Sequence, residues 1–93
     1  KGLIDAVTDA EILEAYKRLA ARSGVFAEPA SAASVAGMLK LHRAGYFKKH
    51  KDARIVCTLT GHGLKDPDIA IKNVAPPVSL NPEVKAILKE IGL

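Results

Sequence analysis

The chain has 93 residues, of which 48% are apolar and 26% are charged, and its formal net charge at neutral pH is +4. These values are typical of one small globular domain and exclude disordered, collagen-like and membrane-spanning compositions. No apolar run approaches the roughly 20 residues that a bilayer span requires, and no segment has the pattern of a signal peptide. We therefore expect a cytoplasmic protein without a membrane partner.

The cysteine and histidine content argues against a disulfide framework and against a metal centre. The single cysteine, Cys57, lies in an apolar run and cannot form an internal disulfide, so we interpret it as a small buried apolar residue. A lone free thiol fits a reducing compartment. The three histidines, His42, His50 and His62, show no metal-ligand spacing with it. The sequence thus predicts no metal site.

Four basic residues gather in one short stretch, at Lys48, Lys49, Lys51 and Arg54. The stretch lacks the interleaved aromatic residues and the arginine density of a nucleic-acid-binding surface, so we interpret it as a solvated loop. The alternative is a free-standing small basic binding module that contacts nucleic acid through this cluster. The chain begins Lys1-Gly2 without an initiator methionine, and we therefore expect it to be a piece of a longer protein.

Two helices are expected in the first half of the chain. Thr8 and Glu11 match a capping box, in which a hydroxyl and a carboxylate each bond an otherwise unpaired backbone amide. The helix that follows ends at Gly24, a typical left-handed cap. Its expected buried face comprises Ile12, Leu13, Tyr16, Leu19 and Ala20. A second helix is expected between Ser31 and Gly45, with a buried stripe at Val35, Met38, Leu39 and His42.

Three short apolar segments alternate with these helices, at residues 3–7, 25–28 and 55–59. The last is nearly continuous and rich in β-branched residues, as in strands covered on both faces. The order strand, helix, strand, helix, strand predicts parallel pairing with right-handed crossovers. The predicted fold class is therefore α/β, a three-layer arrangement with a short parallel sheet of about three strands flanked by helices.

A change of pattern near residue 75 predicts a division of the chain. Residues 68–73 show no clear periodicity, and a double proline at 76–77 marks a linker. A helix start then combines an amide cap, a proline and an acidic residue, at Asn81, Pro82 and Glu83. This helix is expected to end at Gly92. We thus expect residues 1–75 to form one unit, and residues 76–93 to form a linker and a C-terminal helix.

Polar residues stand at the ends of two predicted strands. Thr60 and Gly61 follow the third strand, and Glu28 ends the second. We expect Gly61 and Gly63 to adopt backbone angles that other residues resist. Ligands of open α/β sheets gather outside the carboxyl ends of the strands. A crevice at that edge suits a small molecule or a cofactor better than a protein partner.

Three stretches of the sequence carry a resemblance to a known family. They read TDAEI at 8–12, GVFAEPASAAS at 24–34 and VCTLTGHGLKD at 56–66. In this order and separation they resemble the threonine synthases, which are pyridoxal-phosphate enzymes of the tryptophan-synthase-β-like fold. The resemblance implies that residues 1–75 are the C-terminal part of a pyridoxal-phosphate-dependent α/β domain within that larger fold.

The resemblance also implies an activity and its partners. Threonine synthases convert O-phospho-L-homoserine and water to L-threonine and phosphate, as cytoplasmic biosynthetic lyases that are commonly homodimers. By this resemblance the cofactor is pyridoxal 5'-phosphate. The partners are then the small-molecule substrate and the remainder of the chain, with no nucleic acid. A related pyridoxal-phosphate lyase such as a threonine dehydratase is the alternative within the enzyme class.

The resemblance assigns cofactor-binding roles to three residues of the chain. A hydroxyl residue at the position of Thr60 hydrogen-bonds the pyridine nitrogen of the cofactor, and Glu28 and Gly61 line the same side of the ring. No catalytic residue is assigned, because the family's Schiff-base lysine follows a Ser-Phe-Lys-Asp type motif that does not occur here. Lys65 is not that lysine. The family's Gly/Ser/Thr-rich phosphate loop is also absent, so we expect the 93 residues to be inactive alone.

Overall fold

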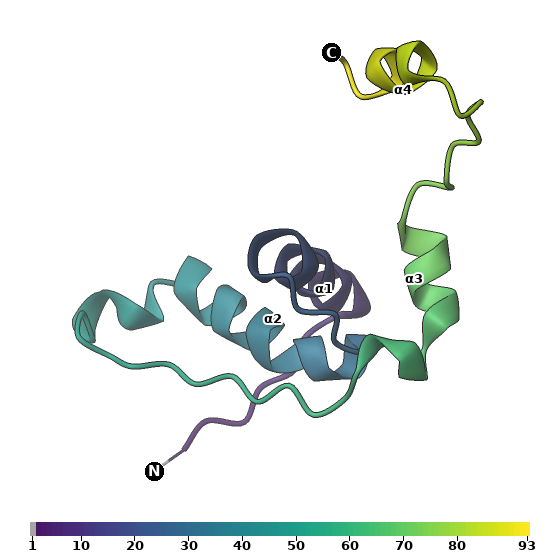
Figure 1. Ribbon diagram of the computed structural model, residues 1–93. Helices are drawn as coiled ribbons and strands as arrows, with labels where there is room; N and C mark the ends of the chain where they lie inside the picture. Colours follow the sequence, from purple (N-terminus) through teal and green to yellow (C-terminus); the bar gives the residue numbers. More distant parts are fainter. Residues whose placement is uncertain (1) are drawn as a thin grey trace.

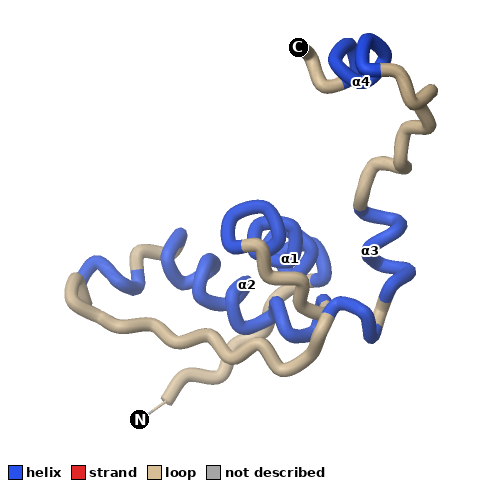
Figure 2. Tube along the Cα trace, in the orientation of Figure 1, coloured by secondary structure: helices blue, strands red, loops and turns tan. Residues whose placement is uncertain are grey.

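The computed structural model describes residues 2–93 of the protein. In this part of the chain, four α-helices and two short 3-10 helices follow one another (Figure 1). They are α1 (Asp9–Ser23), α2 (Pro29–Arg43), η1 (Tyr46–Lys49), η2 (Gly63–Lys65), α3 (Pro67–Asn73) and α4 (Val84–Glu90). The backbone between residues 2 and 93 forms no strand, so the helices in Figure 2 are connected by loops and turns alone.

The two ends of α1 are those that the sequence predicts. The Glu11 amide donates to the Thr8 hydroxyl (3.3 Å), and the Thr8 amide donates to the Glu11 carboxylate (2.7 Å), which completes the capping box. These bonds favour the charged carboxylate, so the Thr8 amide, and after it the Thr8 hydroxyl, lower the pKa of Glu11. At the other end, Gly24 adopts a φ of 65° and caps the helix in the left-handed conformation.

The start of α2 lies two residues before the predicted one. Pro29 occupies the first turn, where its missing amide and its fixed φ are tolerated. The proline also keeps Glu28 out of helical geometry, and Glu28 has an extended backbone with φ −70° and ψ 153°. The helix ends at Arg43, and Gly45 follows with a φ of 77°.

The core is the interface between α1 and α2. Ala15 and Tyr16 of α1 pack against Ala32 and Ala36 of α2, and none of the four is more than 7% exposed. Val7, Ile12, Leu19, Val35 and Leu39 are partly buried around them. The small alanine side chains let the two helix backbones approach closely. The alanine-rich start of α2 therefore covers α1, and not a sheet.

The predicted three-stranded parallel sheet is wrong for residues 2–93. The segments at 3–7 and 55–59 form no strand, and the segment at 25–28 contributes one isolated antiparallel bridge between Ala27 and His62. An apolar, β-branched run predicts burial, but a strand also needs a neighbouring strand whose backbone completes its hydrogen bonds. No two of the three predicted segments pair with each other in the described residues.

Two of these segments contact α2 instead. The chain before α1 is tied to α2 by Lys40, whose Nζ donates to the Ala6 carbonyl oxygen (2.7 Å) and lies 3.0 Å from Asp5 Oδ2. The hydrogen bond from Lys40 lowers the pKa of Asp5. The loop at residues 51–60 runs along the same helix (Figure 1), and the Ser34 hydroxyl donates to the Thr58 carbonyl oxygen (3.0 Å).

The C-terminal part differs from the prediction in two places. The helix α3 was not expected, although Pro67 at its start and Asp68 in its first turn are typical of a helix N-terminus. The helix α4 begins at Val84 with Glu83 as its N-cap, so Asn81 and Pro82 precede the helix and do not cap it. Gly92 has a φ of 78° and ends this helix region as predicted.

The chain is extended rather than compact. Its radius of gyration is 17.7 Å, with extents of 60 × 28 × 19 Å, whereas a compact domain of this length has a radius of about 12 Å. Figure 1 shows that α3 and α4 lead away from the α1–α2 pair. No helix within residues 2–93 is both long and apolar enough to cross a membrane.

Candidate cofactor-binding site

The candidate site lies where the turn before α2 meets the loop that leads into η2. The Glu28 amide donates to the Gly61 carbonyl oxygen (2.9 Å), and the Gly63 amide donates to the Phe26 carbonyl oxygen (3.0 Å). These bonds place Glu28 beside Gly61, and Thr60 directly precedes Gly61. The structure therefore brings together the three residues that the sequence analysis selected, although by antiparallel and not parallel pairing. Their cofactor role stays a prediction.

Ser31 in the first turn of α2 holds both Thr60 and Gly61. It is 3% exposed. Its Oγ accepts a hydrogen bond from the Gly61 amide (2.6 Å) and shares a second one with the Thr60 Oγ1 (3.0 Å). Ser31 is not among the residues predicted from the sequence, because nothing near a helical serine in the sequence indicates a partner about 30 residues away. The one available signal is that Ser31 lies in the stretch 24–34, which carries part of the family resemblance.

The Thr60 hydroxyl keeps capacity for a further partner. Thr60 is exposed, and its Oγ1 lies 3.0 Å from the Ser31 Oγ. A threonine hydroxyl has one proton and two lone pairs, so one hydrogen bond to Ser31 does not saturate it. The Thr60 oxygen is thus held from one side and can bond a ligand from the other.

Gly61 and Gly63 are required for close approach and not for unusual backbone angles. Neither has a positive φ, so the expectation of unusual backbone angles at Gly61 and Gly63 is wrong. Among the described glycines, only Gly24, Gly45 and Gly92 have a positive φ. A Cβ on Gly61 would lie well inside 3.0 Å of the carboxyl group of Glu28. A Cβ on Gly63 would equally overlap the ring of Phe26. The two glycines therefore let the loop at 61–63 lie against the turn before α2.

Glu28 is the main negative charge of the site. Its side chain is 20% exposed, and its Oε2 lies 3.6 Å from the Nζ of Lys65. Lys65 itself is largely exposed and extends from η2. The ion pair holds the Glu28 carboxylate over Gly61 and engages the lysine nearest to the site.

His62 has a structural role in the same loop. Its Nδ1 accepts a hydrogen bond from the Leu64 amide (3.1 Å), which caps η2. Its ring meets the ring of Phe26 edge to face, with 5.6 Å between the centroids. The cap requires Nδ1 to be unprotonated. No group of three potential metal ligands gathers anywhere in residues 2–93.

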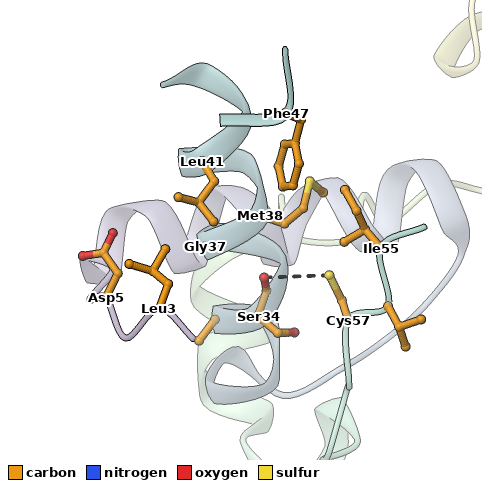
Figure 3. Close-up of a pocket in the computed structure, with 11 residues that line it drawn as sticks. Leu3, Asp5, Ser34, Gly37, Met38, Leu41, Phe47, Ile55 and Cys57 are labelled. Atoms are coloured by element: carbon orange, nitrogen blue, oxygen red, sulfur yellow. Dashed lines mark hydrogen bonds between the residues drawn. The ribbon is translucent and has the colours of Figure 1, made fainter. Parts of the chain in front are cut away.

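A separate apolar groove of about 300 Å³ lies between α2 and residues 55–57 (Figure 3). Met38, Phe47 and Ile55 are among the side chains that line it, and Glu28, Thr60 and Gly61 are not. Cys57 borders the groove half-buried, with its Sγ 3.8 Å from the Ser34 carbonyl oxygen, so it is less buried than the sequence analysis expected. The groove is distinct from the candidate site.

The comparisons with known proteins define the class of this chain. The family described as "Pyridoxal-phosphate dependent enzyme" matches residues 1–61. The chain belongs to this family of pyridoxal-phosphate-dependent enzymes.

Its relatives within that class are threonine synthases. The chain is 50% identical to the threonine synthase of Methanocaldococcus jannaschii, over 97% of this chain and 22% of that protein. It is 51% identical to the threonine synthase of Synechocystis sp., over 98% of this chain and 23% of that protein. It is 49% identical to the threonine synthase of Mycobacterium leprae, over 100% of this chain and 25% of that protein. The chain thus spans about a quarter of the length of the curated relatives that it matches.

The residues of the site fit one edge of the cofactor. A hydroxyl with open hydrogen-bonding capacity, at Thr60, suits a ring nitrogen. Beside it, the Glu28 carboxyl group fills the space that a side chain at Gly61 would occupy. The phosphate group needs a cradle of backbone amides, such as a glycine-rich loop provides, and the sequence contains no such loop. The Thr60 hydroxyl is therefore compatible with the ring nitrogen of pyridoxal phosphate, and the sequence shows no cradle for the phosphate group.

Proposed function

We propose that this chain is the C-terminal part of a threonine synthase, which uses pyridoxal phosphate to convert O-phospho-L-homoserine and water to L-threonine and phosphate. The observation that carries the proposal is the identity of about half of all residues, over nearly the whole chain, to threonine synthases of an archaeon and two bacteria. Residues 1–75 then belong to the cofactor domain, and residues 76–93 are its linker and terminal helix.

In this proposal Thr60 is the residue that contacts the cofactor ring. When bound, pyridoxal phosphate supplies the electron sink that stabilises negative charge on the substrate. A carboxylate beside the ring nitrogen would keep that nitrogen protonated and strengthen the sink. The neutral hydroxyl of Thr60 hydrogen-bonds the nitrogen without adding a charge and so moderates the sink. Glu28 and Gly61 line the same side of the ring.

The chain supplies no catalytic lysine in this proposal. Lys65 is paired with Glu28 (3.6 Å), and its motif differs from the one that carries the family's lysine. The residue that forms the covalent bond to the cofactor and the phosphate-binding loop are then supplied by the remainder of the protein. The 93 residues alone are accordingly inactive.

The remainder of the protein is also the proposed partner of the exposed apolar residues. Val56 is 90% exposed and Ile55 is 48% exposed beside the apolar groove. A monomeric soluble protein rarely leaves such a patch uncovered. We place the complete enzyme in the cytoplasm as a homodimeric lyase, with no nucleic-acid or membrane partner. The four basic residues of the cluster are exposed, with Lys48 and Lys49 at the end of η1 and Lys51 and Arg54 in the loop that follows, and within the complete enzyme they form a solvated surface.

The test is the reaction of the complete protein, expressed with its natural upstream sequence. We expect phosphate release from O-phospho-L-homoserine with stoichiometric L-threonine. Formation of 2-oxobutyrate from L-threonine without phosphate release would instead show a threonine dehydratase. Salt-sensitive binding of nucleic acid through the cluster at residues 48–54, without either activity, would show a basic binding module.

A further inference from the structure

Ser31 is a buried polar side chain whose hydrogen bonds determine where the proton of Thr60 points. It lies in the first turn of α2 at 3% exposure. Its Oγ has two partners among the described residues, the Gly61 amide at 2.6 Å and the Thr60 Oγ1 at 3.0 Å. The next residue of the helix, Ala32, is part of the core between α1 and α2.

The donor and acceptor roles in this cluster follow from counting protons. A serine hydroxyl has one proton and two lone pairs. A backbone amide can only donate, so the Ser31 Oγ accepts from Gly61. If Thr60 also donated to Ser31, the buried proton of Ser31 would have no acceptor in the described part of the chain, which buried polar groups avoid. Ser31 therefore donates to Thr60, and the proton of Thr60 points away from Ser31.

We propose that Ser31 is a positioning residue that makes Thr60 a hydrogen-bond donor to the pyridine nitrogen of the cofactor. This inference rests on the proposed function and deepens it. A donor at that position pairs with the nitrogen lone pair and so favours an unprotonated ring nitrogen. Without Ser31, Thr60 can rotate and accept a hydrogen bond from a protonated nitrogen equally well. Ser31 thus selects the protonation state of the ring through Thr60 without touching the cofactor.

The test compares variants of the complete holoenzyme. Ser31→Ala removes the hydroxyl, and Ser31→Cys keeps the size with a weaker donor. Ser34→Ala is the matched control, because Ser34 lies on the same helix and bonds the same loop, at the Thr58 carbonyl oxygen, but does not contact Thr60. Thr60→Ala tests the underlying cofactor contact.

The first measurement is the visible absorbance of the bound cofactor as a function of pH. We expect Ser31→Ala to introduce a pH-dependent change that the parent and Ser34→Ala lack, with Ser31→Cys between them. The kcat of Ser31→Ala should fall by about tenfold, the effect of losing one well-placed hydrogen bond, with little change in KM. The second measurement is hydrogen exchange of the Gly61 amide in the cofactor-free protein, which should become several-fold faster in Ser31→Ala.

The outcomes separate the two proposals. If Thr60→Ala changes the cofactor spectrum and Ser31→Ala does not, the Thr60 contact stands and the role of Ser31 is overturned. Faster hydrogen exchange of the Gly61 amide in Ser31→Ala, together with an unchanged cofactor spectrum, would also overturn the positioning role. It would show that Ser31 only stabilises the loop. If neither variant changes the spectrum, both the positioning role and the proposed cofactor contact are wrong. If Ser31→Ala does not accumulate as folded protein, the comparison of Ser31→Cys with the parent decides.

Discussion

Substitution of Gly61 by alanine tests whether the site depends on close contact between Gly61 and Glu28. The backbone of Gly61 does not have a positive φ, so alanine meets no conformational strain there. Its Cβ would instead overlap the Glu28 carboxyl group, closer than real Cβ contacts occur. The carboxylate must move, which disrupts its ion pair with Lys65. Any effect of the substitution is therefore steric and passes through Glu28.

The size of this effect follows from the contacts. Overpacking of a filled site costs about 1–3 kcal/mol, and we expect the lower half of this range because a carboxylate at the end of a flexible side chain can swing away. Removing that side chain by Glu28→Ala should cost at most about 1 kcal/mol, since its partner Lys65 is 66% exposed. The double variant should then be more stable than Gly61→Ala alone, with a coupling free energy of about 1 kcal/mol.

The assay is chemical denaturation of the complete cofactor-free protein, with the free energy of unfolding compared across the four forms of this double-mutant cycle. Gly37→Ala is the control, because a Cβ at that helical position meets nothing within 4 Å among residues 2–93. It should raise the free energy of unfolding by about 0.5–1 kcal/mol. Additive effects of Gly61→Ala and Glu28→Ala, within about 0.3 kcal/mol, would refute the steric argument.

Three further changes test other parts of the structure. Gly63→Ala places its Cβ in the ring of Phe26, which packs against two other rings. It should lower the free energy of unfolding by about 2–3 kcal/mol in denaturant titrations. A loss smaller than that of Gly61→Ala would contradict the close contact between Gly63 and Phe26. Thr8→Ala removes a helix cap and should cost about 1 kcal/mol. Because the bonds from Thr8 lower the pKa of Glu11 from its ordinary value of 4.5, the stability linked to Glu11 is complete above that value and is lost as the pH falls through the lower folded-state pKa. NMR titration should show a partial rise of the pKa of Glu11 toward 4.5 in Thr8→Ala, because only the hydroxyl is lost and the backbone amide of residue 8 still donates to the carboxylate. An unchanged pKa would exclude the Thr8 hydroxyl as one of its causes. In the complete enzyme, Thr60→Ala should alter the cofactor spectrum and slow turnover, and Thr60→Asp should perturb the spectrum more; two variants indistinguishable from the parent would remove Thr60 from the site.

The turn before α2 explains why residues distant in sequence form one site. Pro29 starts the helix and leaves Glu28 with an extended backbone, so the Glu28 amide can donate to the carbonyl oxygen of Gly61. Two residues into the helix, Ser31 reaches the same loop with its side chain. A single helix N-terminus therefore anchors the 60–61 segment through both backbone and side-chain bonds. A ligand that contacts Thr60 is positioned by α2 through these bonds.

Local chemistry was sufficient to predict both ends of α1 and the end of α4. The capping box at Thr8 and Glu11, the left-handed cap at Gly24 and the end at Gly92 depend on neighbours within four or five residues, so the sequence alone specifies them. The resemblance to threonine synthases was equally readable from three short stretches. The helix α3 was missed because its seven residues carry too few periodic apolar positions to stand out from a loop.

Contacts between distant segments could not be predicted in this way. The apolar run at 55–59 predicts an apolar environment for its side chains. Only the arrangement of the whole chain decides whether a strand lies beside this run. Among residues 2–93, the run lies along α2 and pairs with no strand. Ser31 was missed for the same reason, since its partners Thr60 and Gly61 are about 30 residues away. Glycine was read as a sign of backbone freedom at Gly61, but the tertiary contact with Glu28 is what requires it. Helix caps depend on hydrogen bonds within one helical turn, so the local sequence determines them. Strand pairing and side-chain packing depend on which distant segments come into contact, and only the folded chain determines those contacts.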